Sequence, residues 1–204
     1  MVIVRENTED LYTGKEFSLG DSAVALRIIS EYASKRIAKY AFETAKQRNS
    51  MKKVTCVHKS NVMRLTDGLF AKSCTEIAKN YPDISFEQMY VDACAMNLIR
   101  QPEQFDVIVT TNLFGDILSD LASMLTGSIG MLPSASLASD GSGMYEPIHG
   151  SAPDIAGQNV ANPLATILSL SMLFRYSLDD AQTADQVEQA VSQVLTDGLR
   201  TKDI

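Results

Sequence analysis

The chain has 204 residues, of which 45% are hydrophobic and 21% are charged. This balance is typical of a globular protein with a sizeable core and excludes a disordered chain. The 18 Lys and Arg residues against 25 Asp and Glu residues give a net charge of −7, which argues against a nucleic-acid-binding surface because such surfaces are basic. No apolar run reaches the roughly 18 residues of a membrane span, and no signal peptide is visible. We therefore expect a cytoplasmic protein with neither a nucleic-acid nor a membrane partner.

The cysteines point to the same reducing compartment. Cys56, Cys74 and Cys94 are widely spaced, odd in number and form no CxxC pair, so they do not have the spacing of a structural zinc site. Free cysteines are among the most buried residue types. We expect three buried, reduced thiols.

Strand-like apolar runs and helical periodicities alternate along the chain. In chain order, the pattern predicts a strand at 2–4, a helix at 21–48, a strand at 54–57, a helix at 66–79, a strand at 86–90, a helix at 93–99, a strand at 107–111 and helices at 116–125, 164–176 and 184–199. The first helix is expected to begin at the potential N-cap Asp21-Ser22. Residues 126–162 hold most of the remaining Gly and Pro and predict loops. Such alternation predicts an α/β fold.

Two carboxylates in the segment 112–120 (NLFGDILSD) are spaced for one helix face. Asp116 and Asp120 are four residues apart, so on a helix they lie about one turn from each other and repel unless a cation lies between them. Mg²⁺ or Mn²⁺ is the natural partner of such oxygen ligands, although a solvated acidic stripe fits the spacing as well. Asp92, between a predicted strand and a predicted helix, is either a helix N-cap or a third ligand.

Three further side chains each allow a chemical and a structural interpretation. Lys59 follows a predicted strand, where ligands of α/β sheets bind, and a desolvated lysine there can transfer protons; the alternative is an exposed lysine in a turn. Arg5 and Tyr12 can serve as a carboxylate clamp and a phenol proton donor. Equally, they can form a surface ion pair and an aromatic at the edge of the core.

A Gly/Ser-rich loop at residues 149–154 (HGSAPD), followed by Asn162-Pro163, is rich in backbone donors that can hold a nucleotide or phosphate. The chain has neither a GxGxxG segment after a strand nor a GxxxxGK[ST] segment, so both common nucleotide-binding fingerprints are missing. The loop alone predicts a ligand site only weakly.

Four stretches in this order resemble the β-decarboxylating dehydrogenases, the family of isocitrate, 3-isopropylmalate, homoisocitrate and tartrate dehydrogenases. The stretches are 4–12 (VRENTEDLY), 57–61 (VHKSN), 112–120 and 146–157 (EPIHGSAPDIAG). The resemblance implies an isocitrate/isopropylmalate dehydrogenase-like fold of three layers, α/β/α. Residues 1–125 would form the smaller, dimer-forming domain for metal and substrate, and 126–204 part of the larger cofactor-binding domain. Because family members are longer, we expect an incomplete fold, truncated at both ends.

The resemblance also implies roles for individual residues. Asp116 and Asp120 would bind Mg²⁺ or Mn²⁺ together with Asp92 from a partner subunit. Arg5 would hold a substrate carboxylate, and Tyr12 and Lys59 would transfer protons, with Lys59 acting across a homodimer. The residues implied in cofactor binding are His149, Gly150, Ser151, Ala152, Asp154 and Asn162. Asp154 implies NAD, because NADP-dependent isocitrate enzymes carry lysine there and a carboxylate would repel the 2′-phosphate.

The activity implied is NAD-dependent oxidative decarboxylation of a 2-hydroxy-3-carboxy acid. The region from residues 131–136 to residues 175–178 resembles 3-isopropylmalate dehydrogenase of leucine biosynthesis, which favours 3-isopropylmalate as the substrate. Residues 5–12 are more similar to isocitrate and archaeal isopropylmalate enzymes. Isocitrate, homoisocitrate and tartrate therefore stay open as substrates, as does a catalytically inactive fragment or subunit. Four apolar residues of the helix predicted at 116–125 and its surroundings fit either a dimer interface or a monomer core: Leu118, Leu121, Met124 and Leu125.

Overall fold

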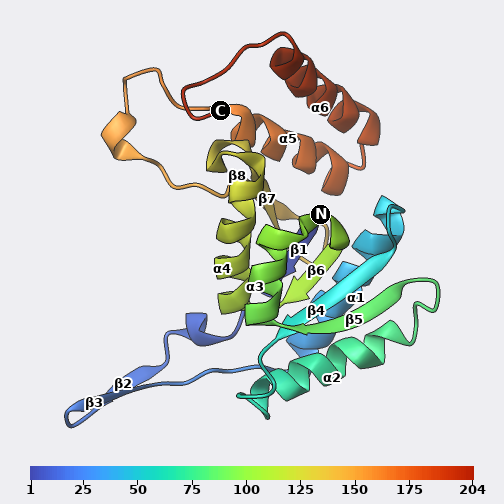
Figure 1. Cartoon of the computed structure of the whole chain (residues 1–204), viewed down its shortest axis with the longest axis vertical. Coiled ribbons are helices and arrows are strands. Elements are labelled where there is room, and N and C mark those ends of the chain that lie inside the picture. Colours follow the sequence, from blue (N-terminus) through green and yellow to red (C-terminus); the bar gives the residue numbers. More distant parts are fainter. The chain divides into compact units, whose positions relative to one another are not determined.

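The computed structural model describes all 204 residues and divides them into two compact units, residues 1–121 and 122–204 (Figure 1). The division falls close to the expected boundary between residues 125 and 126. None of the helices combines the length and the apolar character needed to cross a membrane.

A parallel four-stranded sheet forms the centre of the first unit. Its strands, in spatial order, are β1 (Val2–Arg5), β6 (Val107–Thr110), β4 (Lys53–His58) and β5 (Ser85–Tyr90). All four were predicted from apolar runs in the sequence. Because the strands are parallel, their carboxyl ends share one edge of the sheet, where ligands of α/β proteins bind. Arg5, Lys59 and Asn112 all lie at or just beyond these ends.

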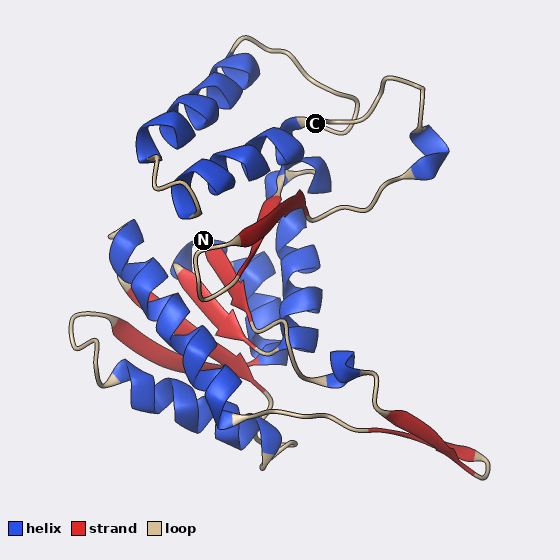
Figure 2. Ribbon diagram, turned by 180° about the vertical axis from the view of Figure 1, so that it is seen from behind, coloured by secondary structure: helices blue, strands red, loops and turns tan.

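Helices cover both faces of this sheet (Figure 2), which confirms the three-layer α/β/α architecture. The helices α1 (Glu31–Arg48) and α2 (Thr66–Ala78) pack on one face around Phe42 and Phe70. The helices α3 (Val91–Arg100) and α4 (Asn112–Ser123) pack on the other face around Leu98 and Leu118. All three cysteines are free and buried in these two cores, as predicted.

The prediction of one helix over 21–48 is wrong in its first ten residues. Strands β2 (Glu16–Leu19) and β3 (Ser22–Ala25) form an antiparallel hairpin that projects from the first unit (Figures 1 and 2). Gly20 turns the chain with a left-handed φ of 66°, which glycine adopts without steric cost. The helix begins only after Ser30, whose Oγ accepts the Ala33 N–H at 3.1 Å. Pairing along the hairpin outweighs the helical spacing of the apolar residues.

The second unit contains an unpredicted hairpin and two predicted helices. Strands β7 (Pro133–Leu137) and β8 (Gly143–Pro147) pair within the stretch expected to be loops, because small and polar residues hide the alternation that marks a strand. The helix α5 (Leu164–Tyr176) begins and ends as predicted and packs against both strands and α6 (Ala181–Thr196). α6 begins at Ala181, three residues before the predicted start, directly after the cap Asp180, which accepts the Thr183 N–H at 3.0 Å.

Candidate active site

The end of β1 and the start of α4 bring together three residues that the sequence singled out. The Arg5 guanidinium donates from Nη1 to the Asp116 carboxylate and from Nε to Asn112 Oδ1, both at 2.9 Å. Its central carbon lies 5.1 Å from the centre of the Tyr12 ring. A carboxylate-binding group, a phenol and an acidic side chain therefore meet at the carboxyl edge of the sheet.

Gly115 makes this meeting possible. A Cβ atom at Gly115 would lie 2.5 Å from Arg5 Cγ and 2.8 Å from Arg5 Cβ, closer than carbon atoms approach without repulsion. The stem of Arg5 therefore lies directly on the backbone of α4. The glycine within the NLFGDILSD segment is required by the arginine, rather than by a turn.

Tyr12 is placed to donate a proton. Its ring lies on the short 3-10 helix η1 (Leu11–Thr13) and is 53% exposed. Partial burial and the neighbouring Asp116 carboxylate raise the pKa of Tyr12, and the positive charge of Arg5 only partly opposes them. The phenol therefore stays protonated at neutral pH, as a proton donor requires.

Lys59 and Asp92 form a second pair. Lys59 lies in the turn after β4, and its Nζ donates to Asp92 Oδ1 at 2.5 Å. Asp92 lies inside the first turn of α3, while Tyr90 occupies the N-cap position, so the N-cap interpretation of Asp92 is wrong. The hydrogen bond from Lys59 lowers the pKa of Asp92. The structure thus groups Arg5 with Tyr12 and Asp116, and Lys59 with Asp92.

The second unit contains a cavity of about 1160 Å³. Five of the six residues implied in cofactor binding line it, namely His149, Gly150, Ser151, Ala152 and Asn162. The sixth, Asp154, lies on the 3-10 helix η5 (Pro153–Ile155) between the lining residues Ala152 and Ile155.

Asp203 shapes the same cavity and was not singled out in the sequence. Its carboxylate accepts Asn162 Nδ2 at 3.1 Å and also bonds the Ser128 hydroxyl. The hydrogen bond from the Ser128 hydroxyl is the main cause that lowers the pKa of Asp203 to about 2. Asn162 Oδ1 in turn accepts the Leu164 N–H at 3.0 Å, at the start of α5. The amide side chain that faces the cavity is therefore held from both sides.

The sequence model of one protein family, described as isocitrate/isopropylmalate dehydrogenase, matches residues 1–204. The chain belongs to this family. It is 57% identical over 210 residues to the 3-isopropylmalate dehydrogenase of Neisseria meningitidis serogroup B and 52% identical over 204 residues to the homoisocitrate dehydrogenase of Methanocaldococcus jannaschii. Each alignment covers 100% of the chain and 58% of the relative, so the chain spans a little over half the length of these dehydrogenases.

A solved structure of the family has the same fold. The crystal structure of isocitrate dehydrogenase from Methylococcus capsulatus superimposes with a TM-score of 0.91 at 45% sequence identity, covering 98% of this chain and 59% of that one. The family and the fold class expected from the sequence are both confirmed.

The chemistry of α4 fits a divalent cation. Asp116 and Asp120 lie one helical turn apart, and the Asp116 side chain is 45% exposed although it pairs with Arg5. Carboxylate oxygens are the ligands that Mg²⁺ and Mn²⁺ prefer. Within the chain, no group of three or more His, Cys, Asp or Glu side chains is placed to hold a metal ion. The convergence of Asp92 with the other two aspartates stays a prediction about an assembly of two subunits.

The acidic residues of the segment 4–12 hold its backbone. Glu6 is buried and accepts the N–H groups of Thr8 and Glu9 at 3.0 Å each, as well as Arg36 Nη2 at 2.9 Å. Glu9 accepts the backbone N–H of Ser30 at 2.7 Å. These bonds fix the turn between Arg5 and Tyr12. The motif in segment 4–12 therefore contains residues that shape the turn as well as the two candidate site residues at its ends.

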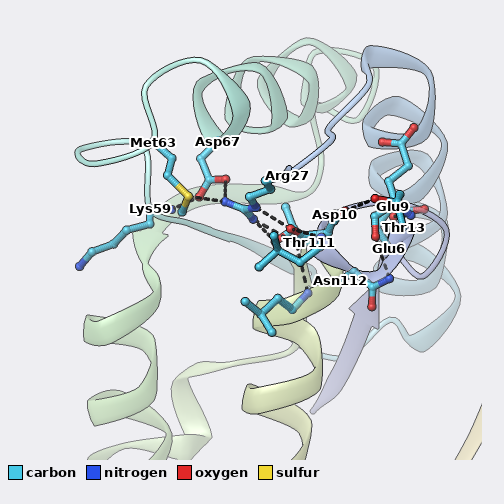
Figure 3. Close-up of polar contacts among 12 residues, drawn as sticks. Glu6, Glu9, Asp10, Thr13, Arg27, Lys59, Met63, Asp67, Thr111 and Asn112 are labelled. Carbon is cyan, nitrogen blue, oxygen red and sulfur yellow. Dashed lines mark hydrogen bonds and ion pairs between the residues drawn. The ribbon is translucent and has the colours of Figure 1, made fainter. Parts of the chain in front are cut away.

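A buried ion cluster beneath the site was also missed. Arg27 lies between the carboxylates of Asp10 and Asp67 (Figure 3), and both carboxylates are fully buried. Burial tends to raise the pKa of Asp10, but bonds from Arg27 and from backbone amides outweigh it and lower the pKa. At Asp67 burial prevails and raises the pKa. The only trace in the sequence was a single charge, Arg27, among apolar neighbours.

Proposed function

We propose that the protein is an NAD-dependent and divalent-metal-dependent dehydrogenase that oxidises and decarboxylates 3-isopropylmalate, the reaction of this family in leucine biosynthesis. The observation that carries the proposal is the contact of Arg5 with both Tyr12 and Asp116. A carboxylate clamp, a protonated phenol and a metal-type carboxylate in one group suit a 2-hydroxy-3-carboxy acid. The 57% identity to a 3-isopropylmalate dehydrogenase supports this substrate.

Each residue of the group has one task in this reaction. The planar Arg5 guanidinium offers five N–H donors and can hold a substrate carboxylate beside Asn112 and Asp116. Lys59, once its ammonium has released a proton to solvent, would take the proton of the C2 hydroxyl as C2 is oxidised, and Tyr12 would return a proton to C3 after CO₂ leaves. When bound, NAD would supply the hydride acceptor, and a divalent cation held by the aspartates would supply Lewis-acid chemistry at the substrate oxygen.

The cation would be held by Asp116 and Asp120, with Asp92 supplied by a second copy of the chain, and Lys59 would act across the same homodimer. Exposed apolar side chains on α3 and α4, among them Met96, Ile99 and Ile117, support such an assembly. Leu118 and Leu121 belong instead to the monomer core, whereas Met124 and Leu125 are exposed.

The adenosine part of NAD would bind in the cavity of the second unit. Backbone groups of residues 149–152 and the Asn162 amide line it, and the Asp154 carboxylate would accept the ribose hydroxyls. A negative charge at that position disfavours NADP. The first unit would then form the metal and substrate domain, and residues 126–204 would contribute to the cofactor domain. Three free, buried thiols support a cytoplasmic location.

The homoisocitrate dehydrogenase relative, at 52% identity, supports a second candidate substrate. Two completed enzymes separate the candidates. In each, residues 1–204 replace the matching 58% of a relative: the Neisseria 3-isopropylmalate dehydrogenase in one case and the Methanocaldococcus homoisocitrate dehydrogenase in the other. NADH formation with Mn²⁺ is then followed with the substrate of each relative.

We expect both completed enzymes to form NADH. The Neisseria form should retain a larger fraction of the kcat/KM of its relative than the Methanocaldococcus form does. The reverse order would favour homoisocitrate. If neither form produces NADH while both fold, residues 1–204 are a catalytically inactive piece and the proposed function fails. The Tyr12→Phe form of each completed enzyme is the control for contaminating activity.

A further inference from the structure

The cluster of Asp10, Arg27 and Asp67, called here the Arg27 cluster, joins three segments that are far apart in the sequence. Asp10 precedes η1, Arg27 follows the hairpin strand β3, and Asp67 lies in the first turn of α2. The Arg27 side chain is only 10% exposed. Two buried acids around one buried cation are costly, and apolar residues of similar volume often stabilise a core equally well. Stability alone therefore gives little reason for this arrangement.

On one side, the cluster fixes the segment that carries Tyr12. Arg27 grips Asp10 side-on, with Nε donating to Oδ1 at 2.5 Å and Nη2 donating to Oδ2 at 3.1 Å. The same carboxylate accepts the N–H of Leu11 at 2.9 Å and that of Leu113 at 3.1 Å. Asp10 thus starts both the 3-10 helix that bears Tyr12 and the helix α4.

On the other side, the cluster fixes the backbone of Lys59. Arg27 Nη1 donates to Asp67 Oδ1 at 2.5 Å, and Asp67 Oδ2 accepts the Lys59 N–H at 2.5 Å. Figure 3 shows the Lys59 side chain pointing away from the guanidinium. The carboxylate therefore holds the main chain of Lys59 and leaves its Nζ to reach Asp92.

We propose that Arg27 is a positioning residue that, by bridging Asp10 and Asp67, sets the placement of the Tyr12 turn relative to the Lys59 turn. The inference rests on the proposed function of Tyr12 and Lys59. Lysine cannot replace this group, because an ammonium is a point charge without the planar fork that grips two carboxylates at once. Two further contacts orient the fork: Nη2 donates to the Thr111 hydroxyl at 2.9 Å, and the guanidinium lies 4.9 Å from the centre of the Phe114 ring.

The test compares Arg27→Lys with a matched control, Arg48→Lys. Arg48 also pairs with a buried carboxylate, Asp106, at 3.0 Å, but it contacts no residue of the candidate site. Hydrogen exchange of the Lys59 backbone amide is measured in the 204-residue chain by NMR. Values of kcat and KM are measured in the completed Neisseria form, and unfolding midpoints in urea are measured for all variants.

In Arg27→Lys we expect the Lys59 amide to exchange about tenfold faster than in Arg48→Lys. We expect kcat to fall by about tenfold or more, because small misplacements of reacting groups are expensive. KM for NAD should stay within twofold, since the cluster contributes no residue to the cofactor cavity. Unchanged exchange at Lys59, or equal losses of kcat and stability in the two variants, would overturn the inference.

Two outcomes need separate handling. If Arg27→Lys does not fold, Thr111→Val takes its place, because it removes a single acceptor of Arg27. In that variant, a kcat lowered about fivefold and Lys59 exchange about fivefold faster would support the inference. An unchanged kcat together with unchanged Lys59 exchange would overturn it. If the unsubstituted completed enzyme is inactive, the proposed function fails. Exchange at Lys59 then still decides whether Arg27 positions this turn.

Discussion

The two candidate sites of this chain are held in opposite ways. Around Arg5, the hydrogen bonds join residues more than a hundred positions apart: 107 for Arg5 to Asn112 and 111 for Arg5 to Asp116. Within residues 149–158 of the loop that carries most of the cofactor residues, the bonds are local, one position for His149 to Gly150 and four for Gln158 to Asp154. Residues 150–161 are exposed throughout. The side chains around Arg5 are thus held by long-range bonds, which suits the pre-organised site that the proposed catalysis needs, whereas residues 149–158 are held by bonds between near neighbours.

Removal of a proton-transfer group should have the largest effect. Lys59→Met is expected to lower kcat of the completed enzyme by about 10²–10⁴-fold, because a positioned acid or base contributes that much. Lys72→Met, at an exposed position of α2, is the control and should leave kcat unchanged. Steady-state kinetics measures both. Equal kcat values for the two variants would remove Lys59 from the chemistry.

A methyl group at Gly115 should break the site around Arg5 without replacing any of its side chains. Gly115→Ala forces the Arg5 stem away from α4 and is expected to cost about 1–3 kcal/mol of unfolding free energy, as overpacking does. It should also lower kcat/KM by more than about tenfold, since Arg5 loses its contact with Asp116.

Gly68→Ala is the matched control for Gly115→Ala. Gly68 lies inside α2, and a Cβ there meets no atom within 4 Å. This change should raise the unfolding free energy by about 0.5–1 kcal/mol, because alanine favours a helix over glycine. Urea unfolding of both variants checks the signs. A stable, fully active Gly115→Ala variant would contradict the close approach of Arg5.

A substitution in the cofactor loop should change the preference for NAD over NADP more than it changes the stability of the fold. Asp154→Lys is expected to raise KM for NAD by about tenfold, the equivalent of roughly 1.4 kcal/mol of lost binding, and to lower KM for NADP. Asp197→Lys makes the same charge change at the end of α6, away from the loop. If both variants shift the two KM values alike, general charge rather than a contact of residue 154 explains the preference.

The smallest effect concerns acid stability. Because the folded pKa of Asp203 is lowered from 3.8 to about 2, its contribution is fully present above the unfolded value and is lost as the pH falls toward 2. Asp203→Asn should therefore have a lower urea midpoint than the parent at pH 5, and the difference should shrink between pH 4 and pH 2. A constant difference over that range would mean that the charge of Asp203 is not what stabilises the fold.

The sequence predicted most elements of the sheet and its helices because their patterns are local. Strands β1, β4 and β6 contain short apolar runs, β5 has apolar residues at Phe86, Met89 and Tyr90, and α5 follows a helical period from Leu164 to Tyr176. The two hairpins escaped prediction for a different reason in each case. Residues 22–25 imitate the period of the helix that follows, and β7 and β8 consist largely of small and polar residues.

The residues of the candidate site also divide into those that a local sequence pattern marks and those that depend on contacts between distant segments. Arg5, Tyr12, Lys59 and the aspartates were singled out because they lie in segments that resemble the motifs of the family. Arg27 bonds Asp10 and Asp67, which are 17 and 40 positions away, and Asp67 bonds the Lys59 N–H, eight positions away. No spacing rule in a single sequence reports such pairs. Glu6 lies in a motif that resembles the family, but only the three-dimensional structure shows that its carboxylate accepts the Thr8 N–H.

Arg27 bonds Asp10 with one side of its guanidinium and Asp67 with the other. In the proposed dimer, the Tyr12 turn serves the subunit that carries it, whereas the Lys59 turn serves the neighbouring subunit. An Arg27→Lys substitution in one chain would then disturb both reaction centres of the dimer: the Tyr12 turn in one centre and the Lys59 turn in the other. Dimers with one normal and one Arg27→Lys chain should consequently lose well over half of the normal rate.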